Sequence, residues 1–246
     1  MTTILPVISD LQVPLHDDRA VAAVATFVAD QGLDTVCVGD VLDAWQVSHW
    51  HKGLAGEFDG LFDLAREQAI GVLESLRVRD VSRSNHDDRL ETYIRRYAPG
   101  ISSLPELRFE NFMRFTENGI RFHRSPVEIA PEWLLMHGDE GSLLATPGST
   151  ALNIAKKTGM SVVCGHTHRL GLQHYCTSFA GRTTRTIWGM EVGHLMDMAG
   201  ADYLKGGMAN WHQGFGILVI EEDLVTPFPI AISSGSFHWE GKRWKA

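Results

Sequence analysis

Short runs of β-branched and other apolar residues recur along this chain, and several of them end in an aspartate, asparagine or histidine. In the first half these runs alternate with helix-like segments: "ILPVIS" at 4–9 precedes an alanine-rich stretch at 17–32, and "DTVCVGD" at 34–40 precedes a helical stretch at 57–76. Strands that alternate with helices favour parallel pairing, because the chain must cross back over the sheet before the next strand begins. The pattern therefore predicts an α/β fold.

The second half of the chain is richer in strands. A third strand is expected within 78–88, followed by short helices at 90–97 and 107–115. Further strands are expected at 119–125, 132–141, 161–168, 170–176, 182–190, 215–223 and 225–232, interrupted by one helix at 149–159. Strand-rich segments after a βαβαβ start indicate a layered β-sandwich flanked by helices. No repeat, linker or low-complexity tract divides the chain, so we expect a single domain over 1–246.

Composition narrows the classes of function. The net charge is −8, which argues against a protein that holds duplex nucleic acid by broad charge neutralisation. A nuclease stays open, because bound divalent cations can supply the local positive charge. No glycine-rich phosphate loop is present. The three widely spaced cysteines indicate a reducing compartment, and no signal peptide or membrane-length apolar run is seen, so we expect a cytoplasmic protein with no membrane partner.

Polar side chains follow five of the expected strands at the point where each strand ends. They are Asp10 and Gln12, Asp40 and Asp43, Asn85 and His86, His137, and the pair His166 and His168. A single such residue is more often a helix cap or a turn residue. In α/β folds, however, ligands bind at the carboxyl ends of strands, and five decorated strand ends are hard to explain as caps. We therefore interpret them as one site.

The donor types indicate a metal centre. Carboxylates, amides and imidazoles without any thiolate suit Mn²⁺, Fe, Zn²⁺ or Mg²⁺ and argue against a structural zinc site. Seven donors are too many for one tetrahedral ion and suit two ions that share a bridging carboxylate. In "CGHTHRLG" at 164–171, the two histidines can converge only if the strand has ended and the backbone is turning, for which Gly165 supplies conformational freedom.

The ordered motifs "DLQ", "GDVLD", "SNHD", "MHG" and "GHTH", from about Ile4 to His168, resemble the signature of calcineurin-like metallophosphoesterases, and the segment 189–220 resembles phage-encoded members. The resemblance implies a protein of the host cytoplasm if phage-encoded. It implies two divalent ions, with Mn²⁺ favoured and Fe, Zn²⁺ or Mg²⁺ as alternatives. The implied ligands are Asp10, Gln12, Asp40 and His168 for the first ion, and Asp40, Asn85, His137 and His166 for the second. His86 would be the catalytic histidine and Asp43 the acid that orients it.

Two positions depart from the family pattern. Gln12 stands where the family usually has histidine, and an amide oxygen is a weaker donor than imidazole, so the first site should be looser and tilt toward Mn²⁺ or Mg²⁺. His16 is an alternative ligand there, although we expect it to fix the loop. Ser84 replaces a glycine, which is a mild change if the backbone at that residue avoids positive φ.

The function implied is that of a metal-dependent phosphodiesterase or phosphatase, with cyclic nucleotides such as 2′,3′-cyclic species, or other small phosphodiesters, as substrates. Asn85, His86, Arg89 and Arg169 are the candidate substrate contacts, and Trp45 and Trp211 are candidates for base stacking. A repair-type DNA nuclease of the same superfamily and a non-catalytic scaffold that retains the fold are the alternatives. Nucleic acid as a partner is not favoured, and the oligomeric state is left open.

Overall fold

The computed structural model describes residues 2–58, 60–200 and 209–246. Its strands are β1 (Thr2–Ile8), β2 (Thr35–Cys37), β3 (Val78–Ser82), β4 (Arg121–His123), β5 (Val127–Ala130), β6 (Trp133–Leu135), β7 (Ser161–Cys164), β8 (Leu170–Phe179), β9 (Arg182–Val192), β10 (Gly214–Glu221), β11 (Leu224–Ala231), β12 (Ser236–Trp239) and β13 (Lys242–Lys245). Its α-helices are α1 (Asp18–Asp30), α2 (Phe62–Ser75), α3 (Arg89–Tyr97), α4 (Phe109–Phe112) and α5 (Ser149–Thr158). Short 3-10 helices lie between them, among them η1 (Trp45–Val47), η2 (His49–His51) and η3 (Ala55–Phe58).

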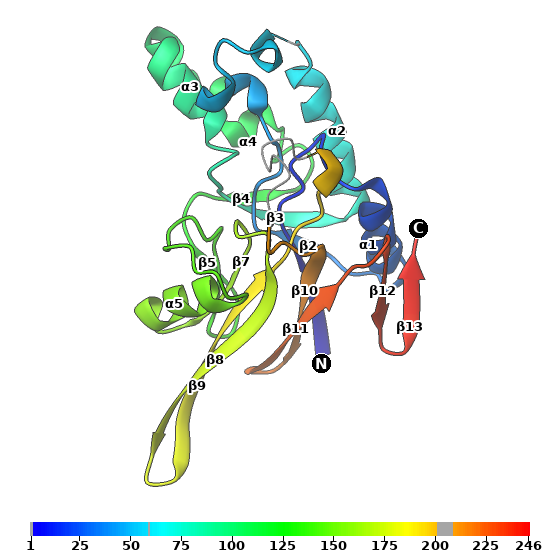
Figure 1. The fold of residues 1–246 in the computed structure, drawn as a ribbon, viewed down its shortest axis with the longest axis vertical. Coiled ribbons are helices and arrows are strands. Elements are labelled where there is room, and N and C mark those ends of the chain that lie inside the picture. The colour runs from blue at the N-terminus through cyan, green and yellow to red at the C-terminus, as the bar shows by residue number, and fades with distance from the viewer. Residues whose placement is uncertain (1, 59, 201–208) are drawn as a thin grey trace.

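Within the described ranges the strands form two main sheets. One has the order β11-β10-β1-β2-β3-β4, and the other has the order β5-β6-β7-β9-β8. The run from β1 to β4 is parallel, and so are β6, β7 and β9, whereas the flanking strands pair antiparallel. The parallel strands of each sheet therefore end at a common edge (Figure 1).

Side-chain alternation along the strands separates the layers. Val7 packs into the cluster between the sheets, while its neighbour Ile8 packs under α1 and α2. In β7, Val163 joins the inter-sheet cluster, while Val162 packs with α5. Because adjacent strand residues point to opposite faces, each sheet packs against helices with one face and against the other sheet with its opposite face. This confirms the expected α/β fold with a layered β-sandwich flanked by helices.

Helix α1 fixes one outer face. The Asp17 side chain caps it by accepting the backbone N–H groups of Arg19 and Ala20 at 2.9 and 3.1 Å. Phe27 then packs against Phe237 and Trp244, with ring centroids 5.6 and 5.1 Å apart. The hairpin β12–β13 is thereby held against α1.

Several expected boundaries were wrong. The α2 helix begins at Phe62 instead of residue 57, because η3 and the left-handed Gly60 (φ 69°) interrupt the chain. The helix expected at 107–115 is only α4, and Arg114 (φ 53°) stands in a left-handed conformation where the chain leaves it. Strands β5, β12 and β13 were not expected.

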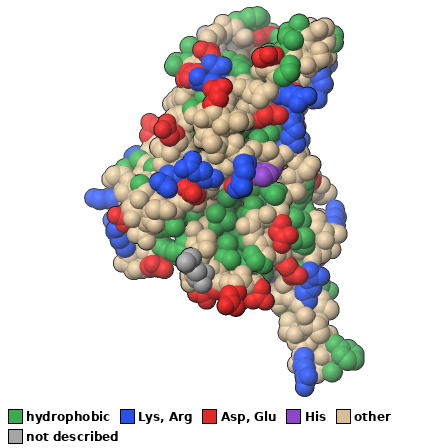
Figure 2. Space-filling model, turned by 180° about the vertical axis from the view of Figure 1, so that it is seen from behind, with side chains coloured by type: hydrophobic (Ala, Val, Ile, Leu, Met, Phe, Trp, Pro, Cys, Tyr) green, Lys and Arg blue, Asp and Glu red, His purple; other side chains and the backbone are tan. Residues whose placement is uncertain are grey.

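Two parts of the molecule extend beyond the sheets. Helices α2, α3 and α4 gather in a lobe beyond the strand ends, and the β8–β9 hairpin projects from the opposite end (Figures 1 and 2). Among the described residues, no helix is long and apolar enough to cross a membrane.

Candidate metal centre

Buried acids and histidines converge at the common edge of the two sheets. Among the described residues, two groups of three have ligand atoms within 4.8 Å of one another: Asp40, His137 and His166, and Asp10, Asp40 and His168. Asp40 belongs to both groups, and all of these residues except His166 are buried. The arrangement can accommodate two cations that share one carboxylate.

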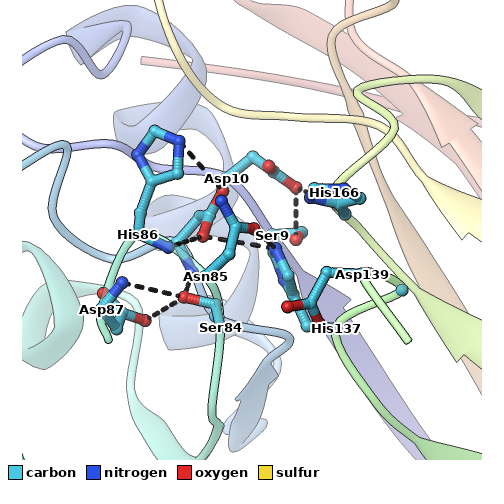
Figure 3. Close-up of polar contacts among 12 residues, drawn as sticks. Ser9, Asp10, Ser84, Asn85, His86, Asp87, His137, Asp139 and His166 are labelled. Atoms are coloured by element: carbon cyan, nitrogen blue, oxygen red, sulfur yellow. Dashed lines mark hydrogen bonds and ion pairs between the residues drawn. The ribbon is translucent and has the colours of Figure 1, made fainter. Parts of the chain in front are cut away.

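Each of these residues stands just past a strand end. Asp10 follows β1 and Asp40 follows β2 in the first sheet, while His137 follows β6 and both His166 and His168 follow β7 in the second. Figure 3 shows Asp10, His137 and His166 approaching one another from separate loops. The centre therefore lies across the junction of the two sheets.

The backbone of this site is unusual. Asp10, Gln12, Asp40, His166 and His168 all have left-handed φ values, between 45° and 63°. A left-handed conformation costs an L-residue of order 1 kcal/mol, and such residues persist only where the surrounding structure enforces them. Five of them within one cluster point to a functional requirement for these side-chain directions.

Gly165 has a different role from the one expected. It does not have a left-handed φ, and the turn is made by the histidines that follow. A Cβ at this position would lie 1.8 Å from Ser9 Oγ and 2.5 Å from Asp10 Oδ2. Glycine is needed because the β7 loop passes against the β1 loop with no room for a side chain.

Replacing Gly165 with alanine is expected to lower the free energy of unfolding by about 3 kcal/mol, at the upper end of overpacking costs, because backbone must move. The matched control is Gly71→Ala in α2, where a new Cβ meets nothing within 4 Å. It should stabilise the protein by roughly 0.5–1 kcal/mol. Chemical denaturation of both variants measures the difference, and equal midpoints would contradict the close approach.

The carboxylates are only partly satisfied by the protein. Asp10 Oδ2 accepts hydrogen bonds from Ser9 Oγ at 2.5 Å and from the His166 backbone N–H at 3.0 Å. Asp10 Oδ1 is buried without a hydrogen bond in the described chain, although His168 Nε2 lies 2.9 Å away. A buried carboxylate oxygen that faces imidazole nitrogens matches the donor set of a divalent cation. The residues present therefore fit a metal.

Charge balance supports the same conclusion. Burial alone would raise the pKa of Asp40, but the neighbouring His137 and His86 hold it well below its usual range. Burial alone would lower the pKa of His137, but the charge of Asp40 raises it to about 10. Without metal, a proton on His137 offsets part of the negative charge of the buried carboxylates, and a bound cation would take the place of that proton.

Two amides lie within the same cluster. Asn85 Oδ1 is 3.0 Å from His137 Nε2. Gln12 Nε2 is 3.2 Å from His168 Nε2 and 3.5 Å from Asp40 Oδ2. The structure thus brings both amides to the ligand groups predicted for them. His16 lies elsewhere, with its Nε2 3.2 Å from Asp18 Oδ1.

His86 stands beside this centre. Its Nδ1 is 3.3 Å from Asp43 Oδ1, and its Nε2 is 3.9 Å from Asp40 Oδ2 and 2.9 Å from Arg89 Nη2. Burial would lower the pKa of His86, but the charges of Asp40 and Asp43 raise it. These two carboxylates thus favour the protonated form of the imidazole, while the Arg89 guanidinium opposes it.

The remaining candidate contacts differ in placement. Arg89 Nη1 donates to the Asp43 backbone oxygen at 2.5 Å, which holds it at His86. Arg169 is half-buried after His168. The ring of Trp211 lies 4.2 Å from that of His168, and Trp45 begins η1.

The chain is similar to known proteins whose names do not state a function. The chain is 36% identical over 255 residues to the "Gene 54 protein" of Mycobacterium phage D29, covering all of both chains. It is 35% identical, with the same coverage, to the "Gene 54 protein" of Mycobacterium phage L5. The chain belongs to the gene 54 protein family. No protein-family model matches it.

Solved structures resemble this gene 54 family member only distantly. Vacuolar Protein Sorting 29 from Cryptosporidium parvum aligns with a TM-score of 0.48 at 17% identity, covering 100% of this chain and 96% of the other. Vps29 complexed with Zn²⁺ from Entamoeba histolytica gives 0.48 at 16%, covering 99% and 98%. A predicted phosphoesterase from Streptococcus pneumoniae TIGR4 gives 0.40 at 13%, covering 100% and 98%.

Sequence reasoning missed the residues that hold the site loops of this gene 54 family member together. Arg83 Nη1 donates to both carboxylate oxygens of Asp139 at 2.7 Å, and its Nε donates to Asp88 at 2.8 Å. Because Arg83 follows β3 and Asp139 follows β6, this fork ties the two sheets together next to the ligands. Each residue is adjacent to a predicted motif, but nothing in the sequence pairs them.

Ser84 and Asp87 perform a similar task within the first sheet. Ser84 avoids positive φ, which meets the condition set for its replacement of glycine. Its Oγ accepts the Asp40 backbone N–H at 2.9 Å and donates to Asp87 at 2.7 Å. Asp87 also accepts the backbone N–H groups of Val41 and Leu42 at 3.2 and 3.3 Å. The β2 loop is therefore anchored on the β3 loop (Figure 3).

His194 is a further buried histidine that follows a strand. It comes after β9, is fully buried, and its ring lies 5.3 Å from that of His168. Burial, reinforced by the charge of His168, lowers the pKa of His194 to about 3, so it is neutral. The glycine-histidine pair after an apolar run, as in "GHTH", was a usable signal for it.

Proposed function

We propose that this protein is a metal-dependent phosphoesterase that hydrolyses phosphodiesters, of which cyclic nucleotides and other small phosphodiesters are the first candidates. The observation that carries the proposal is the pair of ligand groups that share the buried Asp40. The order of motifs that resembles calcineurin-like metallophosphoesterases supports it. Two divalent cations, for which we propose Mn²⁺, would lower the pKa of a water molecule and neutralise phosphate charge when bound.

The protein's own residues would carry the proton transfer. We propose that His86, whose Nδ1 faces Asp43, donates a proton from Nε2 to the departing ester oxygen. Arg89 touches that same nitrogen, so it must yield its position when substrate arrives, and its guanidinium can then neutralise a phosphate oxygen. Asn85 would add a neutral amide on the second-ion side, next to His137.

Hydrolysis with and without metal tests the proposal. The full-length protein, stripped with a chelator, should not cleave bis(p-nitrophenyl) phosphate, and added Mn²⁺ should restore cleavage. The same assay with 2′,3′- and 3′,5′-cyclic nucleotides ranks the substrates. Unchanged turnover in excess chelator would overturn the metal-dependent reaction.

Metal affinity should rise with pH. His137, with its pKa raised to about 10, is protonated throughout the neutral range, and a cation must displace that proton. Raising the pH weakens the competition, so affinity should increase about tenfold per pH unit for each proton displaced. Calorimetric titration with Mn²⁺ at pH 6.5 and 7.5, in two buffers of different ionisation enthalpy, measures the affinity and the protons released. A pH-independent affinity would contradict this assignment.

Gln12→His should tighten the first site, because an imidazole nitrogen binds Mn²⁺ or Fe²⁺ more strongly than an amide oxygen. The Mn²⁺ concentration for half-maximal activity should fall about tenfold, which corresponds to ~1.4 kcal/mol. Gln31→His, at the exposed end of α1, is the matched control. Coincident curves for Gln12→His and the unchanged protein would show that Gln12 is not a ligand, and a His16→Ala titration would then test the alternative.

A further inference from the structure

A cavity of about 250 Å³ opens between η2 and α3 at the edge of the metal centre. Its lining includes Trp50 from η2 and Arg89, Tyr93, Arg96 and Tyr97 from α3, together with Asn85. Asn85 also contacts His137, and Arg89 also contacts His86. A molecule in this cavity would therefore lie directly beside the group proposed to protonate the departing oxygen.

The spacing along α3 explains this lining. Arg89, Tyr93, Arg96 and Tyr97 stand at positions i, i+4, i+7 and i+8, which places them on one face of a helix. Leu90 and Ile94 are the buried residues of the same helix and pack on its other side. The helix thus anchors itself with one face and presents alternating arginine and tyrosine with the other.

The aromatic residues here have no core role. Trp50 is 74% exposed, although its backbone N–H is held by Ser48 Oγ at 3.3 Å. The ring centroids of Tyr93 and Tyr97 lie 4.8 Å apart, with an angle of 54° between the ring planes, and Tyr97 is 39% exposed. Large exposed aromatic side chains gathered at a cavity mark a surface that binds a flat, apolar group.

The charge of the cavity is opposite to that of the whole molecule. The chain carries a net charge of −8, yet the lining holds two guanidinium groups and no carboxylate. Arg89 faces Asp43 Oδ1 at 3.7 Å behind the lining, so Arg96 carries most of the uncompensated charge. In the described part of the chain, no carboxylate forms an ion pair with Arg96. Lys52 adds positive charge, with Nζ 3.2 Å from the centre of the Tyr97 ring. An anion that also carries an aromatic ring matches this combination.

We infer that this cavity binds the nucleoside phosphate portion of the substrate, with the base stacked on Trp50 and Tyr97 and a phosphate held by the arginines. The inference rests on the proposed function and assigns its departing group. In the hydrolysis, a P–O bond forms to the oxygen of water and the P–O bond to the nucleoside oxygen breaks. The nucleoside oxygen takes the proton of His86, and the proton that the water loses passes through solvent to restore His86. Drug-sized ligands fill about 300–1,000 Å³, so this cavity suits one nucleoside and not a duplex.

Binding to the metal-free full-length protein tests the inference without relying on turnover. Adenosine 5′-monophosphate, followed by tryptophan fluorescence and calorimetry, should bind about tenfold more tightly than ribose 5-phosphate, as stacking of one base contributes. Trp50→Ala should remove this preference, whereas Phe179→Ala, which removes a 79% exposed ring of β8, should keep it. Arg96→Ala should weaken both ligands several-fold, while Arg95→Ala, outside the lining, should not.

The outcomes separate the inference from the proposed function. Equal binding of the two phosphates, or equal effects of Trp50→Ala and Phe179→Ala, would overturn the nucleoside site even if bis(p-nitrophenyl) phosphate is cleaved. Retained base preference without any phosphodiester cleavage in Mn²⁺ would overturn the proposed function and leave the nucleoside site supported. A short single-stranded oligonucleotide, compared with adenosine 5′-monophosphate in the same titration, distinguishes a strand end from a free nucleotide as the source.

Discussion

Asp40→Asn is expected to abolish tight binding of both cations and to lower phosphodiester turnover by about 10³-fold or more, since metal stabilisation of the transition state is worth several kcal/mol. The reason is that Asp40, alone among the described residues, belongs to both ligand groups. The substitution keeps the side-chain shape but removes the charge and one acceptor oxygen, so no atom pair remains that could bridge two ions. Metal content by mass spectrometry and turnover of bis(p-nitrophenyl) phosphate provide the measurements.

Asp80→Asn is the matched control for a buried carboxylate. Asp80 is 8% exposed and pairs with Arg121 and His123 at 2.8 and 2.7 Å, away from the ligand groups. This variant should lose some stability but keep both metals and its turnover. If Asp40→Asn retained two cations and full activity, the shared-carboxylate centre would be wrong.

The effect of His86→Ala on turnover should depend on the leaving group of the ester. For esters with alkoxide-like leaving groups, loss of the general acid should lower turnover by about 10²–10⁴-fold. A nitrophenolate leaves without protonation, so bis(p-nitrophenyl) phosphate should lose less than about tenfold. Asp43→Asn should give the same pattern with a smaller amplitude, because Asp43 holds Nδ1 at 3.3 Å and does not itself donate. Equal losses on both ester types would instead make His86 a phosphate-binding group.

The ligand cluster was largely predictable because its geometry follows from one rule. Residues just past the ends of parallel strands meet at the same sheet edge, which predicts that Asp10 lies beside Asp40 in the first sheet and that His137 lies beside His166 and His168 in the second. That these two edges meet depends on how the sheets pack. The same rule applies to His194, which follows β9. The order of strands across each sheet does not matter for this argument.

Other parts of the site depend on tertiary packing that no local pattern encodes. The Arg83–Asp139 fork joins two loops that belong to different sheets, and its partners are 56 positions apart in the chain. Trp50 has the features of a surface residue until α3 is seen beside it. Gly165 was expected to give the turn its conformational freedom, yet its requirement comes from Ser9, more than 150 residues away, whose position only the folded chain defines.

Two errors in the predicted elements have local causes: the β12–β13 hairpin that was not expected, and the helix expected at 107–115 that is only α4. Strands β12 and β13 meet at Glu240 and Gly241, both with positive φ, as a tight hairpin turn requires. That glutamate-glycine turn was a weak signal, because glutamate rarely adopts this conformation. The short α4 ends at a left-handed Arg114 that helix propensity would not anticipate.

The left-handed backbone conformations of the candidate ligand residues place selection for stability in conflict with selection for function. Glycine would relieve the backbone at Gln12 or His168, and each replacement should favour folding as far as backbone strain alone is concerned. Selection for thermal stability alone would therefore enrich variants that lack the donor atoms of these side chains. Amide and imidazole at these positions are therefore expected to persist only under selection for what the site does.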